Sequence, residues 1–457
     1  MMELYAFGFN GHGQLSPPSL SNARFSDINS TPLKIHKAAD ISVVWTSWCD
    51  AVIATKSTPE TPAQYHGSGP LSNHEQTVPL DRNNLSSRVH FGGQFGNGLQ
   101  GFIDNETTSQ NITFIGDPRS PAQETIALPG PIRIQHVVVH SNESLTVIVE
   151  NTTPSSADTN NHHILRFPST PAFKSWLHSP SPEFLNNPIP NFTQVVSNAT
   201  TIAALSPTGR VYTWTNDPRF PKCLGRPISP STPSYAPHPI EYLSETTVTK
   251  LASGGYTTAA LSADGSLFLW GQSAPGTPHE LDVLKDEPPV RDEDLFVPDI
   301  SFDLFLPPPP PSYGPWSPQS SAAWAKEVAR MRYRGELPPH PQDPHPKHAP
   351  DDDADEFVKC VELGHGDELE AYHVGVGNGH VIVAARASGR EAGKRSVFAM
   401  GEAQNGQLGL GQLHGARASF VPGLEAIGAF DGLKVKQIVC RGWSSWVVVE
   451  GHAASED

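Results

Sequence analysis

The chain has 457 residues, and its 31 Lys and Arg against 47 Asp and Glu give a formal net charge of −16. We therefore expect no direct contact with nucleic acid, because a basic patch or tail is the usual footprint of such binding. The short basic run at residues 330–334 is too small to serve as one. The 45 prolines exceed ordinary usage about twofold, which indicates long loops rather than a larger core.

The four cysteines, Cys49, Cys223, Cys360 and Cys440, are scattered and form no C-x-x-C pair. This spacing argues against a zinc finger and against a disulfide framework. No apolar run approaches the ~20 residues of a membrane helix, and no signal peptide precedes the first expected strand. We expect a soluble protein of the cytoplasm, or of cytoplasm and nucleus, that does not associate with membranes.

An apolar strand that ends at a glycine and leads into N-G-Q-L-G recurs along the chain. Its clearest copy spans residues 396–411, SVFAMGEAQNGQLGLG, and a second copy opens the chain at residues 4–15. A weaker copy ends at Gly92, and only the strand remains at residues 211–214 and 267–271. Self-similarity of this kind predicts an array of β-repeats.

Each repeat also has a second half, in which two apolar strands flank a tight turn of small residues. These halves lie at residues 43–54, 137–149, 195–205, 251–261, 372–384 and 438–449. Gly-containing loops at residues 206–209 and 262–265 join two of them to the strand of the next repeat, which is a hairpin signal. A second half and the following strand therefore form one blade. The unmatched ends, residues 4–7 and 438–449, are expected to pair and close a ring without exposed sheet edges.

The motif and its recurrence resemble the RCC1 repeat, which implies an all-β, RCC1-like β-propeller. Six openings are recognisable, near Gly8, Gly92, Phe167, Trp214, Trp270 and Gly401. We expect six blades and leave a seventh, degenerate blade open. Residues 1–457 are expected to form a single propeller with long Pro-rich insertions, since about 84 residues separate Gly8 from Gly92 but only about 56 separate Trp214 from Trp270.

Loops rich in Pro, Ser, Thr and Asn carry the extra length, at residues 57–87, 150–163 and 168–190. The largest insertion, residues 276–356, has a low-complexity sequence that predicts disorder over most of its length. Its proline run at 307–311 is expected to be a spacer or a docking motif. Residues 320–334 are expected to form a short helix whose apolar stripe docks on the ring or binds a partner.

No catalytic, cofactor or metal site is expected. A cluster of His340, His345, His348 and residues 351–353 could be drawn as a metal site, but prolines in a loop supply no scaffold for metal geometry. The turn glycines lack the G-x-x-x-x-G-K-[ST] pattern of a phosphate loop. No Ser/His/Asp, Cys/His or paired-carboxylate grouping stands out.

One set of residues suggests a binding surface. Aligning the second halves places six residues at one turn position: Trp48, Asn142, Thr200, Tyr256, Asn378 and Trp443. Equivalent turns of a propeller lie on one face, and ring closure makes neighbours of the blades that carry Trp48 and Trp443. Because buried Trp and Tyr dominate binding hot spots, Trp48, Tyr256 and Trp443 are the candidates for partner binding. The alternative is that the rings fold over the protein's own loops. Trp45 and Trp446 lie within strands and are assigned to the core.

Among RCC1-like proteins, the chain looks most like the fungal alpha-tubulin-suppressor, killer-toxin-insensitivity branch. The reasons are the strand at residues 4–7, the few repeats, the acidic balance and the lack of a basic tail. This resemblance implies a monomeric, non-catalytic scaffold that binds a small CSL-type metal-binding protein of diphthamide synthesis. It also implies support of Elongator-dependent modification of wobble uridine in tRNA, together with Elongator-associated factors.

The alternative is a guanine-nucleotide exchange factor for Ran or another small GTPase, like the founding member of the family. That member has seven blades, a basic chromatin-binding tail and a wedge that enters the GTPase. Six repeats are counted here, and no wedge is identifiable by residue. An enzyme with an active site on the propeller face is a third possibility, which no motif supports.

Overall fold

The structure is a computed structural model. It describes residues 1–15, 26–58, 60–61, 63–69, 88–93, 98–104, 110–115, 123–128, 130–152, 161–180, 188–215, 217–285, 324, 328, 357–363, 369–388 and 392–451. The chain divides into two units, Met1–Leu284 with Phe357–Asp457, and Lys285–Glu356.

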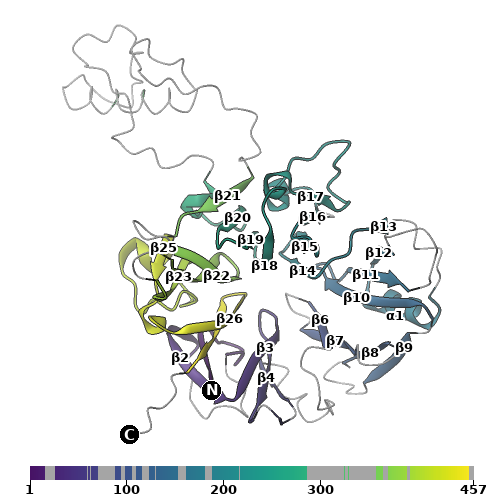
Figure 1. Ribbon diagram of the computed structural model, residues 1–457, viewed down its shortest axis with the longest axis horizontal. Coiled ribbons are helices and arrows are strands. Elements are labelled where there is room, and N and C mark those ends of the chain that lie inside the picture. The colour runs from purple at the N-terminus through teal and green to yellow at the C-terminus, as the bar shows by residue number, and fades with distance from the viewer. Residues whose placement is uncertain are drawn as a thin grey trace. The chain divides into compact units, whose positions relative to one another are not determined.

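The first unit is a ring of seven antiparallel sheets, numbered here as blades 1 to 7 (Figure 1). Blade 1 has the order β26 (Lys434–Arg441), β27 (Ser444–Glu450), β1 (Met2–Phe9), β2 (Ile28–Ala38). Blade 2 has β3 (Asp40–Thr46), β4 (Ala51–Lys56), β5 (Gln64–Ser68), and blade 3 has β6 (Arg88–Gly92), β7 (Leu99–Asp104), β8 (Gln110–Phe114), β9 (Glu124–Leu128).

The remaining blades repeat the four-stranded order from the centre outwards. Blade 4 has β10 (Ile132–Val139), β11 (Leu145–Asn151), β12 (His162–Phe167), β13 (Pro188–Ile189), and blade 5 has β14 (Gln194–Ser197), β15 (Thr201–Leu205), β16 (Val211–Thr215), β17 (His238–Pro239). Blade 6 has β18 (Val248–Gly254), β19 (Thr257–Ser262), β20 (Leu267–Gly271), β21 (Val358–Val361), and blade 7 has β22 (Leu369–Val376), β23 (His380–Ala387), β24 (Arg395–Glu402), β25 (Phe420–Ala426).

Short helices connect or cover these sheets. They are the α-helix α1 (Thr170–His178) and the 3-10 helices η3 (Pro221–Leu224), η4 (Glu241–Leu243), η5 (Asp282–Leu284), η9 (Gly415–Ala418) and η10 (Gly428–Phe430). No helix in the described ranges has the length and apolar character needed to cross a membrane.

The two ends of the chain close the ring, as the sequence predicts. Strand β1 pairs with β27 from Met2 opposite Glu450 to Gly8 opposite Ser444. The backbone N–H of Gly451 donates to the carbonyl of Met1 at 2.9 Å, so the pairing continues past the last strand. Figure 1 shows the purple N-terminal strands beside the yellow C-terminal ones. Both β1 and β27 are therefore inner members of a sheet rather than edges.

The ring has seven blades rather than the six counted in the sequence, and the missing one is blade 3. The sequence pattern assigns the strand ending at Gly92 to the same blade as residues 43–54. In the structure, β4 pairs instead with β5, and β6 pairs with β7 as the innermost strand of a separate blade. Strand β5 falls in the expected loop at residues 57–87, and β7, β8 and β9 lie between Gly92 and residue 137, where the repeat pattern predicts no strands.

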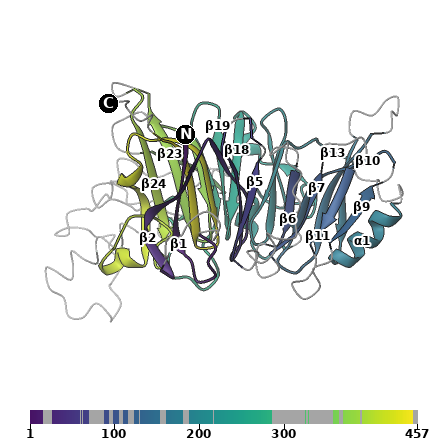
Figure 2. The same cartoon turned by 90° about the horizontal axis from the view of Figure 1, so that it is seen from below.

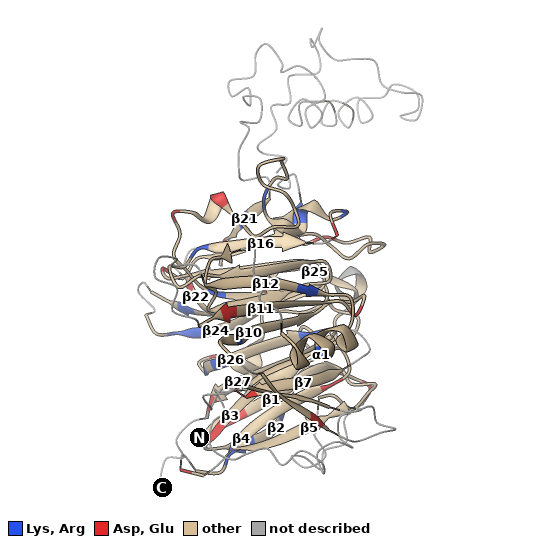
Figure 3. Ribbon diagram, turned by 90° about the vertical axis from the view of Figure 1, so that its right-hand side faces the viewer, with Lys and Arg blue, Asp and Glu red and all other residues tan. Residues whose placement is uncertain are grey.

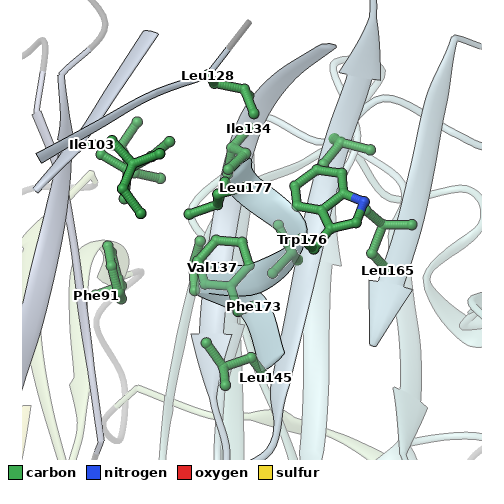
Figure 4. Close-up of a cluster of buried hydrophobic side chains, with 14 of the residues drawn as sticks. Phe91, Ile103, Leu128, Ile134, Val137, Leu145, Leu165, Phe173, Trp176 and Leu177 are labelled. Carbon is green, nitrogen blue, oxygen red and sulfur yellow. The ribbon is translucent and has the colours of Figure 1, made fainter. Parts of the chain in front are cut away.

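A helix also occupies part of the expected loop at residues 168–190. Helix α1 begins at Ser169, whose hydroxyl accepts from the N–H of Ala172, and it buries Phe173, Trp176 and Leu177. These positions, i, i+3 and i+4, lie on one helix face. Figure 4 shows the three side chains among the strand residues of blades 3 and 4, and Figure 2 shows α1 beside β9. The prolines that flank this apolar spacing predict a loop, and that prediction is wrong for residues 170–178.

Polar side chains join neighbouring blades near the ring's centre. The Gln437 amide bonds the backbone N–H and C=O of Val43 at 2.9 Å each, and Gln194 does the same to Leu251 at 2.9 and 2.8 Å. Lys250 bonds His373 at 3.1 Å between the next pair of inner strands. Because buried backbone groups need partners, these side chains fix the spacing between blades.

The N-G-Q-L motif forms a turn held by its glutamine. In the first copy, Gln14 accepts from the N–H of His12 at 3.1 Å and donates to the carbonyl of Phe9 at 2.9 Å. The following Leu15 is fully buried between blades 1 and 2. The polar residue shapes the turn, and the leucine fills the gap between adjacent blades.

Residues 276–284 of the expected insertion belong to the first unit, the ring. Leu281 and Leu284 are buried in one cluster with strand residues of blades 6 and 7. In the second unit, Trp324 and Val328 are helical and buried. The expected disorder of residues 286–356, the proline run and the rest of the 320–334 helix lie outside the described residues.

Charged residues of both signs are interspersed on the side of the ring shown in Figure 3. In that view, Lys and Arg gather into no continuous basic stripe over the described strands. This distribution agrees with the net charge of −16.

Candidate protein-binding rim

The six aligned turn residues lie where the sequence places them, between the first and second strands of their blades. Together with their neighbours these turns form one rim of the ring, called here the turn rim (Trp48, Asn142, Thr200, Tyr256, Asn378 and Trp443). Adjacent turns touch directly. The N–H of Asn378 donates to the carbonyl of Gly442 at 2.7 Å, and the N–H of Ala199 donates to Gly255 at 2.8 Å.

The glycine that ends a third strand connects that strand to the turn rim. Gly8 has φ +108°, and a Cβ there would collide with the carbonyl oxygen of Trp443. The next residue, Phe9, donates its N–H to that same oxygen at 2.9 Å. Gln272 after Gly271 bonds the Tyr256 carbonyl in the same way, at 3.1 Å. Only glycine allows this close approach, which explains the glycine at the end of β1 and of β20.

Trp48 and Trp443 lie against each other at the junction of blades 1 and 2. Their ring centroids are 4.6 Å apart with planes at 70°, an edge-to-face arrangement. Phe9 also packs edge-on against Trp443, with ring centroids 6.0 Å apart and planes at 85°. We call these three residues the aromatic seam. All three are partly exposed, whereas Trp446, three residues further on, is fully buried.

The third candidate, Tyr256, lies on the same rim but in a separate cluster. Its ring packs edge-on against Phe220 with centroids 5.1 Å apart, and its carbonyl accepts from the thiol of Cys223 at 3.2 Å. Burial raises the pKa of its hydroxyl. The described contacts do not join Tyr256 to the aromatic seam. The candidates Trp48, Tyr256 and Trp443 therefore lie in two separate clusters rather than in one site.

A cavity of about 250 Å³ opens on the turn rim between blades 6, 7 and 1. Its described lining includes Trp443, Glu402, Asn378, Asn405, His279 and Phe420. Burial raises the pKa of the Glu402 carboxyl, and the nearby His279 opposes that shift. We call this space the rim cavity.

A second cavity of about 420 Å³ lies at the ring's centre and is walled by the innermost strands. Trp45 lines it and is partly exposed, which corrects its assignment to the core. Arg441 also lines it; burial lowers its pKa to about 10, and its guanidinium donates to the carbonyl of Ser253 at 3.3 Å. The Arg441 hydrogen bond joins β26 to β18, the inner strands of blades 1 and 6.

Among the described residues, no group of three or more His, Cys, Asp or Glu is arranged to hold a metal ion. The His-rich stretch at residues 340–348 and the acidic residues 351–353 lie outside the described part of the chain. In that part the four cysteines are free thiols, and burial raises the pKa of Cys223 and Cys440 to about 12. These two thiols are protonated near neutral pH and are poor nucleophiles.

Sequence reasoning missed Phe9, Glu402 and His279 as rim residues. Phe9 and Glu402 share a signal that could have revealed them: each directly follows the glycine that ends a third strand. Because that glycine sits against a rim turn, the next residue must emerge on the rim. His279 follows no repeat position and could not be found in this way.

No family model and no curated protein sequence matches the chain. Among solved structures, it is similar to Prp20p from Saccharomyces cerevisiae, at 11% identity over 99% of this chain and 92% of that one, with a TM-score of 0.51. It is similar to yeast RCC1 (Prp20) in a complex with Kap60, at 10% identity over 99% and 90%, with a TM-score of 0.52. Human WBSCR16 is similar at 14% identity over 99% and 100%, with a TM-score of 0.41. The ring of seven blades and the two Prp20 structures together show that the chain folds as an RCC1-like β-propeller.

Proposed function

We propose that the protein is a monomeric, non-catalytic interaction scaffold that binds a protein partner through the aromatic seam. The observation that carries this proposal is the pair Trp48 and Trp443, placed edge to face on the rim at 4.6 Å and partly exposed. Large aromatic rings at the centre of a contact are the residues most often found to dominate binding. The rings come from two blades that only ring closure makes adjacent, so the surface exists only in the folded ring.

Alanine substitution separates binding from packing. Trp48→Ala or Trp443→Ala should weaken partner capture by about 2 kcal/mol or more, with a smaller loss of stability because both rings are partly exposed. Trp446→Ala should instead cost about 3–5 kcal/mol of stability. The matched control is Tyr235→Ala, an exposed aromatic residue that is not part of the aromatic seam. Capture and thermal unfolding are measured on the same preparations, and a folded Trp443→Ala protein that retains every partner would rule out this residue.

The partner is proposed from resemblance alone. The fungal alpha-tubulin-suppressor branch suggests a small CSL-type metal-binding protein and Elongator-associated factors, with roles in diphthamide synthesis and tRNA wobble-uridine modification. The same resemblance suggests a cytoplasmic location, with the nucleus as a second site. Affinity capture from the native cell followed by mass spectrometry tests this; recovery of CSL protein and Elongator subunits in a seam-dependent manner is the expected result.

Guanine-nucleotide exchange on Ran or another small GTPase is the second candidate. One observation favours it, the fold shared with Prp20p, whose structure was reported with its binding to Gsp1p and histones. Release of a fluorescent GDP from purified Ran tests this activity directly. Catalysed release, with Ran and histones in the captured fraction, would replace the first proposal by this one.

A further inference from the structure

The rim cavity is too small for a cofactor and suits a single side chain. Its volume of about 250 Å³ is below the ~300–1,000 Å³ typical of small-molecule sites. Blade 1 contributes Trp443 to its wall, so the cavity adjoins the aromatic seam. A partner bound on the seam would place its own side chains at the cavity's mouth.

The Glu402 carboxylate lines this cavity, and the lining residues that the structure describes put no Lys or Arg beside it. The backbone N–H of Glu402 donates to the carbonyl of Gly379 at 2.8 Å. Its side chain lies directly over Gly379, where a Cβ would come within 2.6 Å of the glutamate Cγ. Glycine therefore leaves room for the carboxylate on the cavity wall. The described lining residues include no Lys or Arg, and burial raises the pKa of this carboxyl because it disfavours the charged form.

Aromatic faces and amides complete the wall. Phe420 stacks on His279 with centroids 5.2 Å apart and planes at 21°. Trp443, from blade 1, also lines the cavity. Asn378 and Asn405 also line the cavity. Ring faces attract cations, apolar walls accept the methylene stem of a long basic side chain, and a carboxylate pairs with its charged end.

We propose that the rim cavity takes the Lys or Arg side chain of the protein partner that binds the aromatic seam. This inference rests on the proposed scaffold function and specifies the chemistry of its partner. A chain of net charge −16 also attracts basic partners over distance. The net charge would therefore attract basic partners in general, and the cavity would select a partner with a Lys or Arg at this point of its surface.

The first test uses small probes, so that it does not depend on knowing the partner. Acetyl-lysinamide, acetyl-argininamide and the neutral acetyl-norleucinamide are titrated at constant ionic strength, and the indole N–H signal of Trp443 is followed by NMR. Trp443→Phe identifies that signal. The two basic probes should shift it saturably, and Glu402→Gln should weaken their binding roughly tenfold, because a charge-assisted bond is lost. The control is Glu245→Gln, an exposed glutamate outside the cavity lining, which should change nothing.

The outcomes separate this inference from the proposed function. Equal binding of acetyl-norleucinamide, or no shift with any probe, would overturn the basic-residue assignment. In the second test, Glu402→Gln is compared with Trp48→Ala in partner capture. If only the tryptophan variant loses the partner, the scaffold proposal survives and the cavity assignment fails. If neither loses it, both fail. Loss in both, with thermal stability kept, is the expected result.

Discussion

Blades 1 and 4 each send the chain from their third strand into the gap beside a neighbouring blade. After β1, the polar turn around Gln14 delivers Leu15, which is fully buried between blades 1 and 2. After β12, helix α1 delivers Phe173, Trp176 and Leu177, which are buried between blades 3 and 4. A single leucine, positioned by the turn around Gln14, and a short helix therefore have the same role: each fills the gap between two neighbouring blades.

The two sides differ in what they leave on the rim. At blade 1, the rim turn presents Trp443 beside Phe9 and Trp48. At blade 4, the equivalent Asn142 uses its side chain on its own turn, accepting from the N–H and hydroxyl of Ser144 at 3.2 and 2.7 Å. Of these two blades, blade 1 keeps the repeat motif and presents aromatic groups on the rim, whereas the rim turn of blade 4 presents a polar side chain that bonds within its own turn.

The largest expected effect is on the closing blade, which has no counterpart on the blade 4 side. Deleting residues 1–8 removes the strand between β27 and β2 and exposes a sheet edge. We expect aggregation and loss of the cooperative melting transition, because an unpaired inner strand is a template for association. Size-exclusion chromatography and thermal unfolding measure this.

A circular permutant is the control for this deletion. Gly451 lies within hydrogen-bond distance of Met1, 2.9 Å from N to O. Residues 1–38 can therefore be attached after Gly451 through a short linker, with a new start at Ala39. The permutant should be monomeric and close to wild type in stability. A deletion protein that stays monomeric with an unchanged melting temperature would show that closure by β1 is dispensable.

Truncating the buried side chain that fills either gap should lower the unfolding free energy by a similar amount. Phe173→Ala should cost about 3–5 kcal/mol and Leu15→Ala about 2–5 kcal/mol of unfolding free energy, since both side chains are fully buried. Ser175→Ala on the exposed face of α1 is the control and should stay within about 0.5 kcal/mol. Chemical denaturation measures all three. A loss below about 1 kcal/mol for Phe173→Ala would mean that the helix covers blade 4 without sealing it.

Blade 3 shows why the blade count could not be read from the sequence. A Cβ at Gly92 would collide with the carbonyl of Gly98, and Gly93 bonds that carbonyl at 3.0 Å. This is the contact that Gly8 makes with Trp443. The strand–glycine pattern therefore reports a strand end beside a neighbouring turn, whichever position the strand has in its blade. Position depends on pairing with β7, which no local pattern specifies.

The sequence predicts those rim residues whose place follows from their position in the repeat. Alignment places Trp48 and Trp443 on one rim, and closure makes them neighbours, because both are properties of the ring. The partners of Glu402 depend instead on the course of residues 273–284, which return to the ring between blades 6 and 7. Such a path is set by tertiary packing of Leu281 and Leu284, not by a local signal.

Acidification should lower the stability of the ring by a smaller amount, through a histidine between blades 7 and 1. Burial lowers the pKa of His380 to about 4 from its ordinary value of 6.5, and its ring bonds the hydroxyl of Ser445 between blades 7 and 1 at 2.9 Å. A depressed pKa means that the unfolded state binds the proton first. The stability is therefore present above pH 6.5 and is lost as the pH falls through about 4, a loss of about 3 kcal/mol in all.

Substitution isolates this contribution from other titrating groups. His380→Gln keeps a hydrogen-bonding side chain but cannot titrate, so its stability should depend less on pH between 7 and 4 by about 3 kcal/mol. His373 and His66, whose pKa values burial also lowers to about 4, are more exposed and should contribute less. Denaturant unfolding at a series of pH values measures the difference. Parallel curves for the variant and wild type would exclude His380 as the origin.

Removing the second unit, residues 285–356, should have the smallest effect on the stability of the ring. Replacing residues 285–356 with a short Gly/Ser linker should change stability by less than about 1 kcal/mol, since loop closure costs only about 0.6 kcal/mol per doubling of length. The replacement must begin after Leu284, because that residue and Leu281 are buried in the ring. A matched replacement that begins at Gly276 removes both leucines and should lose several kcal/mol, about 2–5 for each. If the two replacements are equally stable, the leucines do not seal blades 6 and 7. If the shorter replacement also unfolds, residues 285–356 contribute to the core of the ring.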